Sequence, residues 1–279
     1  MPRPLLALAL VPTLALVSAP ARAADAPAAP VADAALPSSA LLERVAPAVV
    51  SVKLVLRGDE HEFTHEAVGA VVDPSGLVVL ANDHLGSDDQ KASDVKVTFG
   101  NDPKEHEAVV VARDSVLGWG WLQVLGLSGP VAAVDLSKDA APSLGLDLRS
   151  VWRVGRGFDF APVVSRHYVS ARVEKPRAMW VASGDTVPLG MPLFDGAGAV
   201  VGLTASQESS EGDEDGTSSS TFLLPIADAR RSLEQAKKRV PDAVEKAKAS
   251  KDAGKSEPEA PKEPAPAGMD GGAAPGAGK

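Results

Sequence analysis

The sequence predicts an all-β domain in the middle of the chain, with a short helix before it and a longer helix after it. Short runs rich in Val, Leu and Ile recur between clusters of Gly, Asp, Pro and Ser, as expected of strands separated by turns. Their spacing is typical of a sandwich or barrel rather than of βαβ units. The predicted strands cover residues 49–56, 68–73, 77–81, 94–99, 108–113, 199–205 and 221–226.

Two segments have the apolar spacing of helices. Leu41, Leu42 and Val45 come just before Pro47, which predicts a short helix ahead of the first strand. Residues 226–240 repeat small and apolar residues at helical spacing, and the face that they form consists of Ile226, Ala229, Leu233 and Ala236.

The composition fits one domain with tails and excludes several classes of function. The 279 residues carry 28 Lys and Arg against 37 Asp and Glu, a formal net charge of -9, and no basic stripe. We therefore expect no nucleic-acid partner, because a phosphate backbone requires a basic surface. The chain has no Cys, so disulfides, thiolate metal ligands and cysteine nucleophiles are excluded.

The N-terminus predicts export. An apolar run at 5–17 follows a basic start, and residues 21–23 have the small-x-small form of a signal-peptidase site, so 1–23 is predicted to be a signal peptide cleaved before Ala24. Pro12 interrupts the run, which is shorter than the ~20 residues that span a bilayer. We expect a periplasmic or secreted protein without a membrane span, and a retained anchor is the alternative.

The remaining chain divides by composition. Residues 24–37 are predicted to be an Ala/Pro-rich linker, and residues 38–240 hold the folded domain. Residues 241–279, rich in Lys, Glu, Pro, Ala and Gly, contain no aromatic residue, Leu or Ile. Such a segment buries too little apolar surface to offset its ordering entropy, so we predict a disordered tail.

His61, Glu62 and His65 match the HExxH pattern of zinc metallopeptidases, which works when a helix brings both imidazoles to one zinc. Here the motif falls between the predicted strands 49–56 and 68–73, so we expect the tip of a β-hairpin. In a strand the two histidines would be roughly 13 Å apart, too far for one ion. We expect no metal site and no cofactor, with a zinc metallopeptidase as a remote alternative.

Five segments together resemble the trypsin-like serine proteases of the HtrA/Deg type. The resemblance covers roughly residues 40 to 236 and implies two six-stranded antiparallel β-barrels packed side by side. It is carried by the order of LLERVAPAVVSV (41–52), VGAVVDPSGLVVLANDH (68–84), AVVVARDSVLGWGWLQV (108–124), PLFDGAGAVVGL (192–203) and FLLPIADARRSLEQ (222–235).

The same resemblance implies that the catalytic residues are lost. That chemistry needs a Ser nucleophile, a His base, an orienting Asp and backbone donors for the oxyanion. Counting back from Pro192, the nucleophile position falls on Leu189 and the oxyanion glycine on Val187, and the Asp position falls on Gly118. No catalytic residue is therefore expected to be intact at these three positions.

The histidine position is ambiguous. Counted from the turn glycine Gly76, the family's His falls on Asp83, while His84 is one residue late. A one-residue slip in a strand turns a side chain to the opposite face unless a bulge absorbs it, so we favour a surface or loop position for His84.

The sequence thus predicts a pseudoprotease that binds or scaffolds an unknown protein or peptide in the cell envelope. HtrA/Deg proteins commonly carry a peptide-binding PDZ domain after the protease domain, and we expect none here. The main alternative is an active serine endopeptidase with a non-standard triad, which a fluorophosphonate probe would reveal.

Overall fold

The computed structural model describes residues 35–58, 61–87, 89–100, 102, 104–138, 140–175, 177–186, 188–207 and 220–255. The predicted signal peptide, the linker up to residue 34, Val187 and the tail from residue 256 lie outside these residues.

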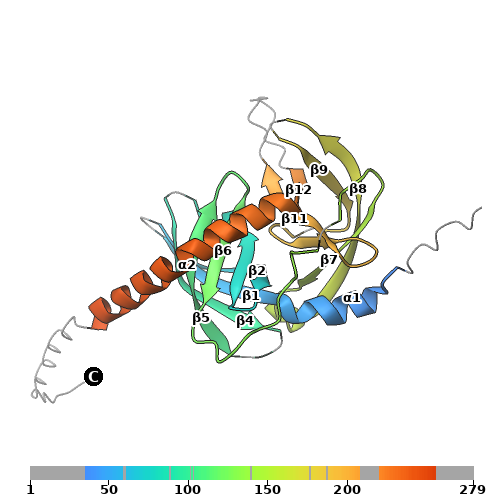
Figure 1. Cartoon of the computed structure of the whole chain (residues 1–279). Helices are drawn as coiled ribbons and strands as arrows, with labels where there is room; N and C mark the ends of the chain where they lie inside the picture. Colours follow the sequence, from blue (N-terminus) through green and yellow to red (C-terminus); the bar gives the residue numbers. More distant parts are fainter. Residues whose placement is uncertain are drawn as a thin grey trace, which may run out of the picture. The chain divides into compact units, whose positions relative to one another are not determined.

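In the part of the chain that the structure describes, twelve strands form two closed antiparallel barrels (Figure 1). The strand order is β1-β2-β3-β6-β5-β4 in the first barrel and β10-β11-β12-β9-β8-β7 in the second. The prediction of two six-stranded barrels is confirmed. The first barrel consists of β1 (Val49–Arg57), β2 (Glu62–Asp73), β3 (Leu77–Ala81), β4 (Lys91–Phe99), β5 (Glu105–Asp114) and β6 (Trp119–Val124). The second consists of β7 (Asp147–Arg153), β8 (Pro162–Val173), β9 (Met179–Gly184), β10 (Pro192–Phe194), β11 (Val200–Gln207) and β12 (Ser220–Pro225).

Alternating side chains explain how the first barrel closes around its core. In β1 the even-numbered residues from Val50 to Leu56 are buried, while Ser51 and Lys53 between them are half-buried on the other face. β1 pairs with β2 on one side and with β4 on the other, so its buried face is enclosed.

The short helix α1 (Ser38–Val45) precedes β1 and continues as the 3-10 turn η1 (Ala46–Ala48). The ordered domain begins before residue 38, because the Leu36 N–H donates to the Gly196 carbonyl at 2.8 Å and the Leu36 side chain packs against the core. The linker was predicted to end at residue 37, but Leu36 already belongs to the folded domain, because its apolar side chain is packed against the core.

The C-terminal helix α2 (Ile226–Lys255) runs along the first barrel (Figure 1) and is longer than predicted. Its buried residues include the predicted face of Ile226, Ala229, Leu233 and Ala236. The prediction of a disordered tail from residue 241 is wrong up to Lys255. Pro241 lies inside the helix.

Beyond Pro241 the helix packs through small side chains and one ion pair instead of through large apolar residues. Ala243 packs against the core, Val244 and Ala247 are half-buried, and Lys251 forms an ion pair with Glu107 of β5. Ala, Lys and Glu, the main residues of this segment, are also strong helix formers. Within the described residues, no helix is both long enough and apolar enough to cross a membrane.

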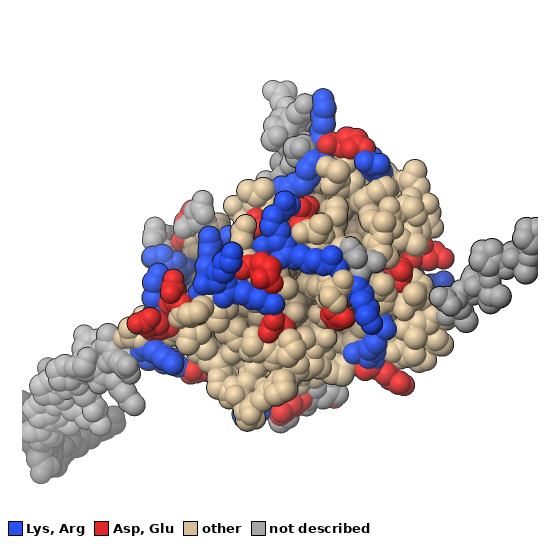
Figure 2. Space-filling model, viewed as in Figure 1, with Lys and Arg blue, Asp and Glu red and all other residues tan. Residues whose placement is uncertain are grey.

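Lys and Arg side chains along α2 alternate with acidic ones (Figure 2). Arg231 forms an ion pair with Asp228. Lys237 Nζ lies 3.0 Å from Asp73 Oδ2 and 3.5 Å from Glu234 Oε1. On this face the helix therefore does not form an uninterrupted basic stripe of the kind that binds nucleic acid.

Candidate functional site

The end of β3 brings together the positions that the sequence aligned with a catalytic triad. The Asn82 N–H, in the 3-10 turn η2 (Asn82–Leu85), donates to the Gly118 carbonyl at 2.9 Å. From the second barrel, Gly190 approaches so closely that a Cβ there would overlap with the backbone nitrogen of Ala81. Gly118, the loop containing Leu189 and the turn containing His84 therefore meet at one junction between the barrels.

The loop before β10 is held by Thr204 of β11. The Gly190 N–H donates to the Thr204 carbonyl at 3.0 Å, and the Met191 N–H donates to Thr204 Oγ1 at 2.9 Å. Thr204 Oγ1 in turn donates to the Pro188 carbonyl at 2.7 Å. The half-buried Leu189 side chain lies in this loop and offers no nucleophilic atom.

Gly118 has a backbone conformation that suits glycine. Its φ is +74°, and a Cβ there would lie 3.5 Å from the Ser206 carbonyl oxygen and 3.6 Å from Ala205 Cβ. Space for a side chain exists, but the left-handed conformation costs an L residue roughly 1–2 kcal/mol. Restoring an Asp here would therefore require local strain.

His84 is half-buried in the 3-10 turn η2 and is directed at a second histidine. Its Nδ1 lies 2.9 Å from Nε2 of His65 in β2, with the ring centroids 5.0 Å apart. η2 turns the chain out of the strand geometry after Ala81, so the two-residue alternation no longer decides where His84 points. Asp83, the other candidate, precedes it in the same turn.

Burial lowers the pKa of His84 below its usual value, and the neighbouring His65 lowers it further. Asp83 acts in the opposite direction without reversing the shift. His84 is therefore expected to be neutral near pH 7.

Residues 67–203 match the family model of the trypsin-like peptidase domain. This match begins in β2 and ends in β11, so it includes strands of both barrels. The chain has a trypsin-like serine protease fold. No curated protein matches it.

Two tryptophans fill the interior of this trypsin-like fold beside the junction. Trp119 and Trp121 of β6 are fully buried. The Trp119 indole donates to the Thr204 carbonyl at 3.0 Å, joining the first barrel to the second, and the Trp121 indole donates to Ser232 Oγ of α2 at 3.1 Å. Ser232 donates onward to Asp114 at 3.0 Å. The Asp114 carboxylate thus accepts a hydrogen bond from α2.

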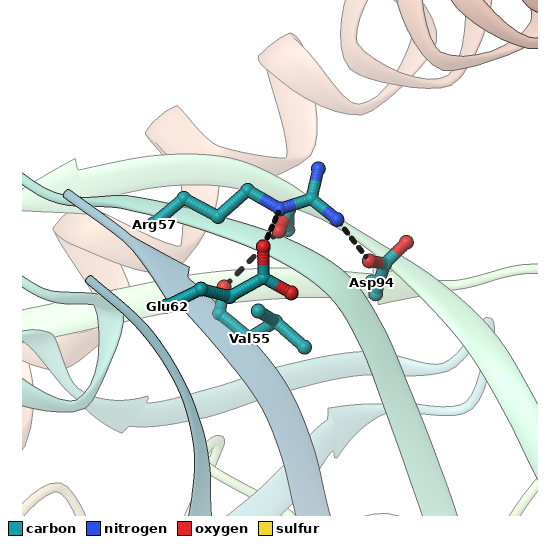
Figure 3. A network of polar contacts seen from close by, with 5 residues as sticks. Val55, Arg57, Glu62 and Asp94 are labelled. Atoms are coloured by element: carbon teal, nitrogen blue, oxygen red, sulfur yellow. Dashed lines mark hydrogen bonds and ion pairs between the residues drawn. The ribbon is translucent and has the colours of Figure 1, made fainter. Parts of the chain in front are cut away.

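The HExxH segment lies in a β-hairpin, as predicted. His61 is exposed at the turn before β2, and Glu62 pairs with Arg57 across the hairpin. Figure 3 shows the Glu62 carboxylate on the Arg57 guanidinium, at 3.0 Å, with Asp94 2.9 Å away on the other side. The motif is not helical, and the carboxylate of its Glu62 forms an ion pair with Arg57.

Two features of this site escaped sequence reasoning. The His65–His84 contact joins segments 19 residues apart in the chain, and only the alternation that puts His65 on the face of the buried Ala67 indicated its direction. No sequence motif indicated that Thr204 holds the loop before β10.

Proposed function

We propose that this chain is an exported pseudoprotease of the HtrA/Deg type, without peptidase activity, that binds a peptide or protein in the cell envelope. The observation that carries the proposal is Leu189, which stands at the aligned nucleophile position in a loop fixed by Thr204. Export rests on the apolar run at 5–17 and the site at 21–23.

The aligned substitutions remove the chemistry at several points. Leu189 cannot attack a carbonyl, and Gly118 has no carboxylate to orient His84. Loss of the nucleophile alone costs roughly a million-fold in turnover in serine proteases. With His84 alone, the site can bind a peptide but is not expected to cleave it.

A cavity of about 660 Å³ beneath α2 supports the binding role. Its lining combines apolar residues such as Val72, Leu136 and Leu233 with the polar residues Asp135, Ser137, Arg230, Glu234 and Lys237. Concave sites that offer both apolar and polar groups can hold the side chains of a ligand.

The test is to treat the purified protein with a serine-directed fluorophosphonate and with unfolded casein, beside an active trypsin-like enzyme. We expect neither labelling nor cleavage. The Leu189→Ser and Leu189→Ala variants form a matched pair: both lose apolar contact, by about 1 kcal/mol at this half-buried position, but only one gains a hydroxyl. Neither is expected to be labelled, because an unactivated serine is a weak nucleophile.

The alternative, an active serine endopeptidase with another triad, has one observation in its favour. Ser150 Oγ lies 2.8 Å from His167 Nε2, within the distance of a nucleophile and its base. Both residues are buried, Ser150 completely, so a peptide carbonyl does not reach the hydroxyl in this conformation. Wild-type labelling that is abolished by Ser150→Ala would establish this alternative and refute the pseudoprotease proposal.

Export is tested separately. Sequencing the N-terminus of protein recovered from the envelope or medium should show Ala24 as the first residue. Exported protein that still begins with Met1 would contradict the signal-peptide prediction.

A further inference from the structure

His65 and His84 bring two imidazole nitrogens together from separate elements of the first barrel, β2 and η2. His84 belongs to the turn that borders the junction described above, and His65 contacts it from β2. We propose that these two histidines bind a divalent transition-metal ion, with Cu(II) bound most tightly.

The spacing of the two nitrogens brings both within reach of one ion. Nδ1 of His84 and Nε2 of His65 are 2.9 Å apart. With metal–nitrogen bonds of about 2.0 Å, this separation corresponds to an angle of about 90° at the metal, that of neighbouring ligands in a square-planar or tetragonal site. Rotation of both rings would turn their lone pairs from each other toward the ion.

Both ligands are carried by anchored backbone. His65 lies within the β1–β2 ladder opposite Leu54, so its Cα position is fixed. η2 is held by Arg113, whose Nε donates to Asn82 Oδ1 at 2.9 Å and whose guanidinium also binds the Gly86 carbonyl. Leu85 is buried next to Gly120, where a larger residue would collide with it. A site on such elements loses little ordering entropy when it binds an ion.

The pair leaves open positions on the metal. Among the described residues, no group of three or more His, Cys, Asp and Glu is placed to hold an ion. Water or a donor atom of a bound partner would complete the coordination. Both histidines are only half-buried, so an ion can reach them from solvent, and the Asp83 carboxylate beside His84 adds favourable negative charge.

The metal preference follows from the ligand type. Imidazole ligands suit Cu, Ni and Zn, and the affinity of a nitrogen site for first-row divalent ions is highest for Cu(II). We therefore expect Cu(II) to bind at least tenfold more tightly than Zn(II).

The test uses the full-length chain without an affinity tag, titrated with Cu(II) or Zn(II) in a calorimeter near neutral pH. The chain has 5 His residues, so every alternative imidazole can be examined. One Cu(II) per chain is expected, and His65→Ala and His84→Ala should each weaken binding by at least tenfold. The matched controls are His61→Ala, four residues before His65 in the HExxH segment, and His106→Ala in β5, which should leave binding unchanged.

Electron paramagnetic resonance of the wild-type protein with one equivalent of Cu(II) gives a second measurement that needs no variant. Hyperfine coupling to two imidazole nitrogens is expected. Coupling to fewer than two, or binding that survives both His65→Ala and His84→Ala, would overturn the proposal and leave the pair as a hydrogen bond. Loss of binding in His61→Ala would overturn it as well, because it would place the ion in the hairpin turn.

Discussion

At the residue scale, a Cβ atom on Gly190 would overlap with the backbone nitrogen of Ala81 and the carbonyl carbon of Leu80, and it would lie 2.9 Å from Leu80 Cα. Gly190 also has a φ of +77°. Gly190→Ala should therefore combine backbone strain of roughly 1–2 kcal/mol with a clash of similar size, lowering the free energy of unfolding by about 2–4 kcal/mol. Urea unfolding measures this loss.

Gly126 provides the matched control. Its φ is +66°, but a Cβ there would meet nothing within 4 Å. Gly126→Ala should cost only the strain, about 1 kcal/mol. If both variants lose the same free energy of unfolding, the loop before β10 does not pack closely against the end of β3.

His167 of β8 should make the protein less stable in mild acid. Burial lowers the pKa of His167 below its usual 6.5, although Asp185 partly opposes the shift. The unfolded chain then binds a proton at a higher pH than the folded one, so the free energy of unfolding falls as the pH is lowered through about 6.5, by up to ~1.4 kcal/mol per pH unit. His167→Gln should remove part of this slope in urea titrations between about pH 7.5 and 5.5.

The matched control is His61→Gln, the same substitution at an exposed position in the hairpin turn. The two variants are compared with the wild type at each pH. A His167→Gln protein with an unchanged slope would show that burial does not hold that imidazole neutral.

Single residues also show where sequence reasoning reaches its limit. The assignment of Leu189 and Gly118 to the aligned catalytic positions rests on counting from neighbouring motifs, because their spacing to Pro192 and to the strand after Gly118 is local. It stays a prediction. His84 could not be placed by counting, since a 3-10 turn rather than a strand sets its direction. Its partner His65 comes from another strand, and only the folded barrel brings them together.

At the scale of elements, the second half of α2 should contribute to stability. Truncation after Val240 removes the half-buried Ala243, Val244 and Ala247 and the ion pair between Lys251 and Glu107. We expect a loss of about 1–2 kcal/mol and a thermal midpoint lower by about 3–6 °C, measured by circular dichroism. The control, truncation after Lys255, should leave the midpoint within about 1 °C of wild type.

The truncation pair also separates two explanations of the helix. If both truncations unfold at the wild-type temperature, residues 241–255 are helical by propensity alone and do not dock on β5. The sequence predicted the first half of α2 from its large apolar face, but the second half docks through alanines, which carry no strong periodic signal.

The strands of the second barrel were harder to predict than those of the first for a similar reason. β7 and β8 alternate apolar residues with Ser, Arg and His, so neither forms a continuous β-branched run. Their polar side chains find partners only after folding, as in the Ser150–His167 contact and in the 2.8 Å bond from the Trp152 indole to Ser165. The number of strands therefore came from the family resemblance rather than from local pattern.

At the scale of the whole molecule, Arg153 joins the second barrel to the start of the first. This buried side chain of β7 donates from Nε to the Val49 carbonyl at 2.9 Å and from its terminal nitrogens to the carbonyls of Ala46 and Phe160, at 2.9 and 2.8 Å. A planar guanidinium can satisfy three carbonyls at once, and no other side chain has this donor geometry. The two barrels should therefore unfold together.

Arg153→Met tests this connection. The substitution keeps much of the apolar stem but leaves three carbonyl oxygens without their donor, so we expect the free energy of unfolding to fall by about 2–4 kcal/mol. Arg172→Met is the matched control in β8, since Arg172 is exposed and pairs with Glu174 at 2.9 Å, and it should cost less than about 1 kcal/mol. Unfolding is followed by urea titration, with fluorescence of Trp119 and Trp121 in the first barrel and of Trp152 and Trp180 in the second. A single transition shifted to lower urea is expected in Arg153→Met, whereas a loss no larger than that of Arg172→Met would show that the barrels are held together by apolar packing without this arginine.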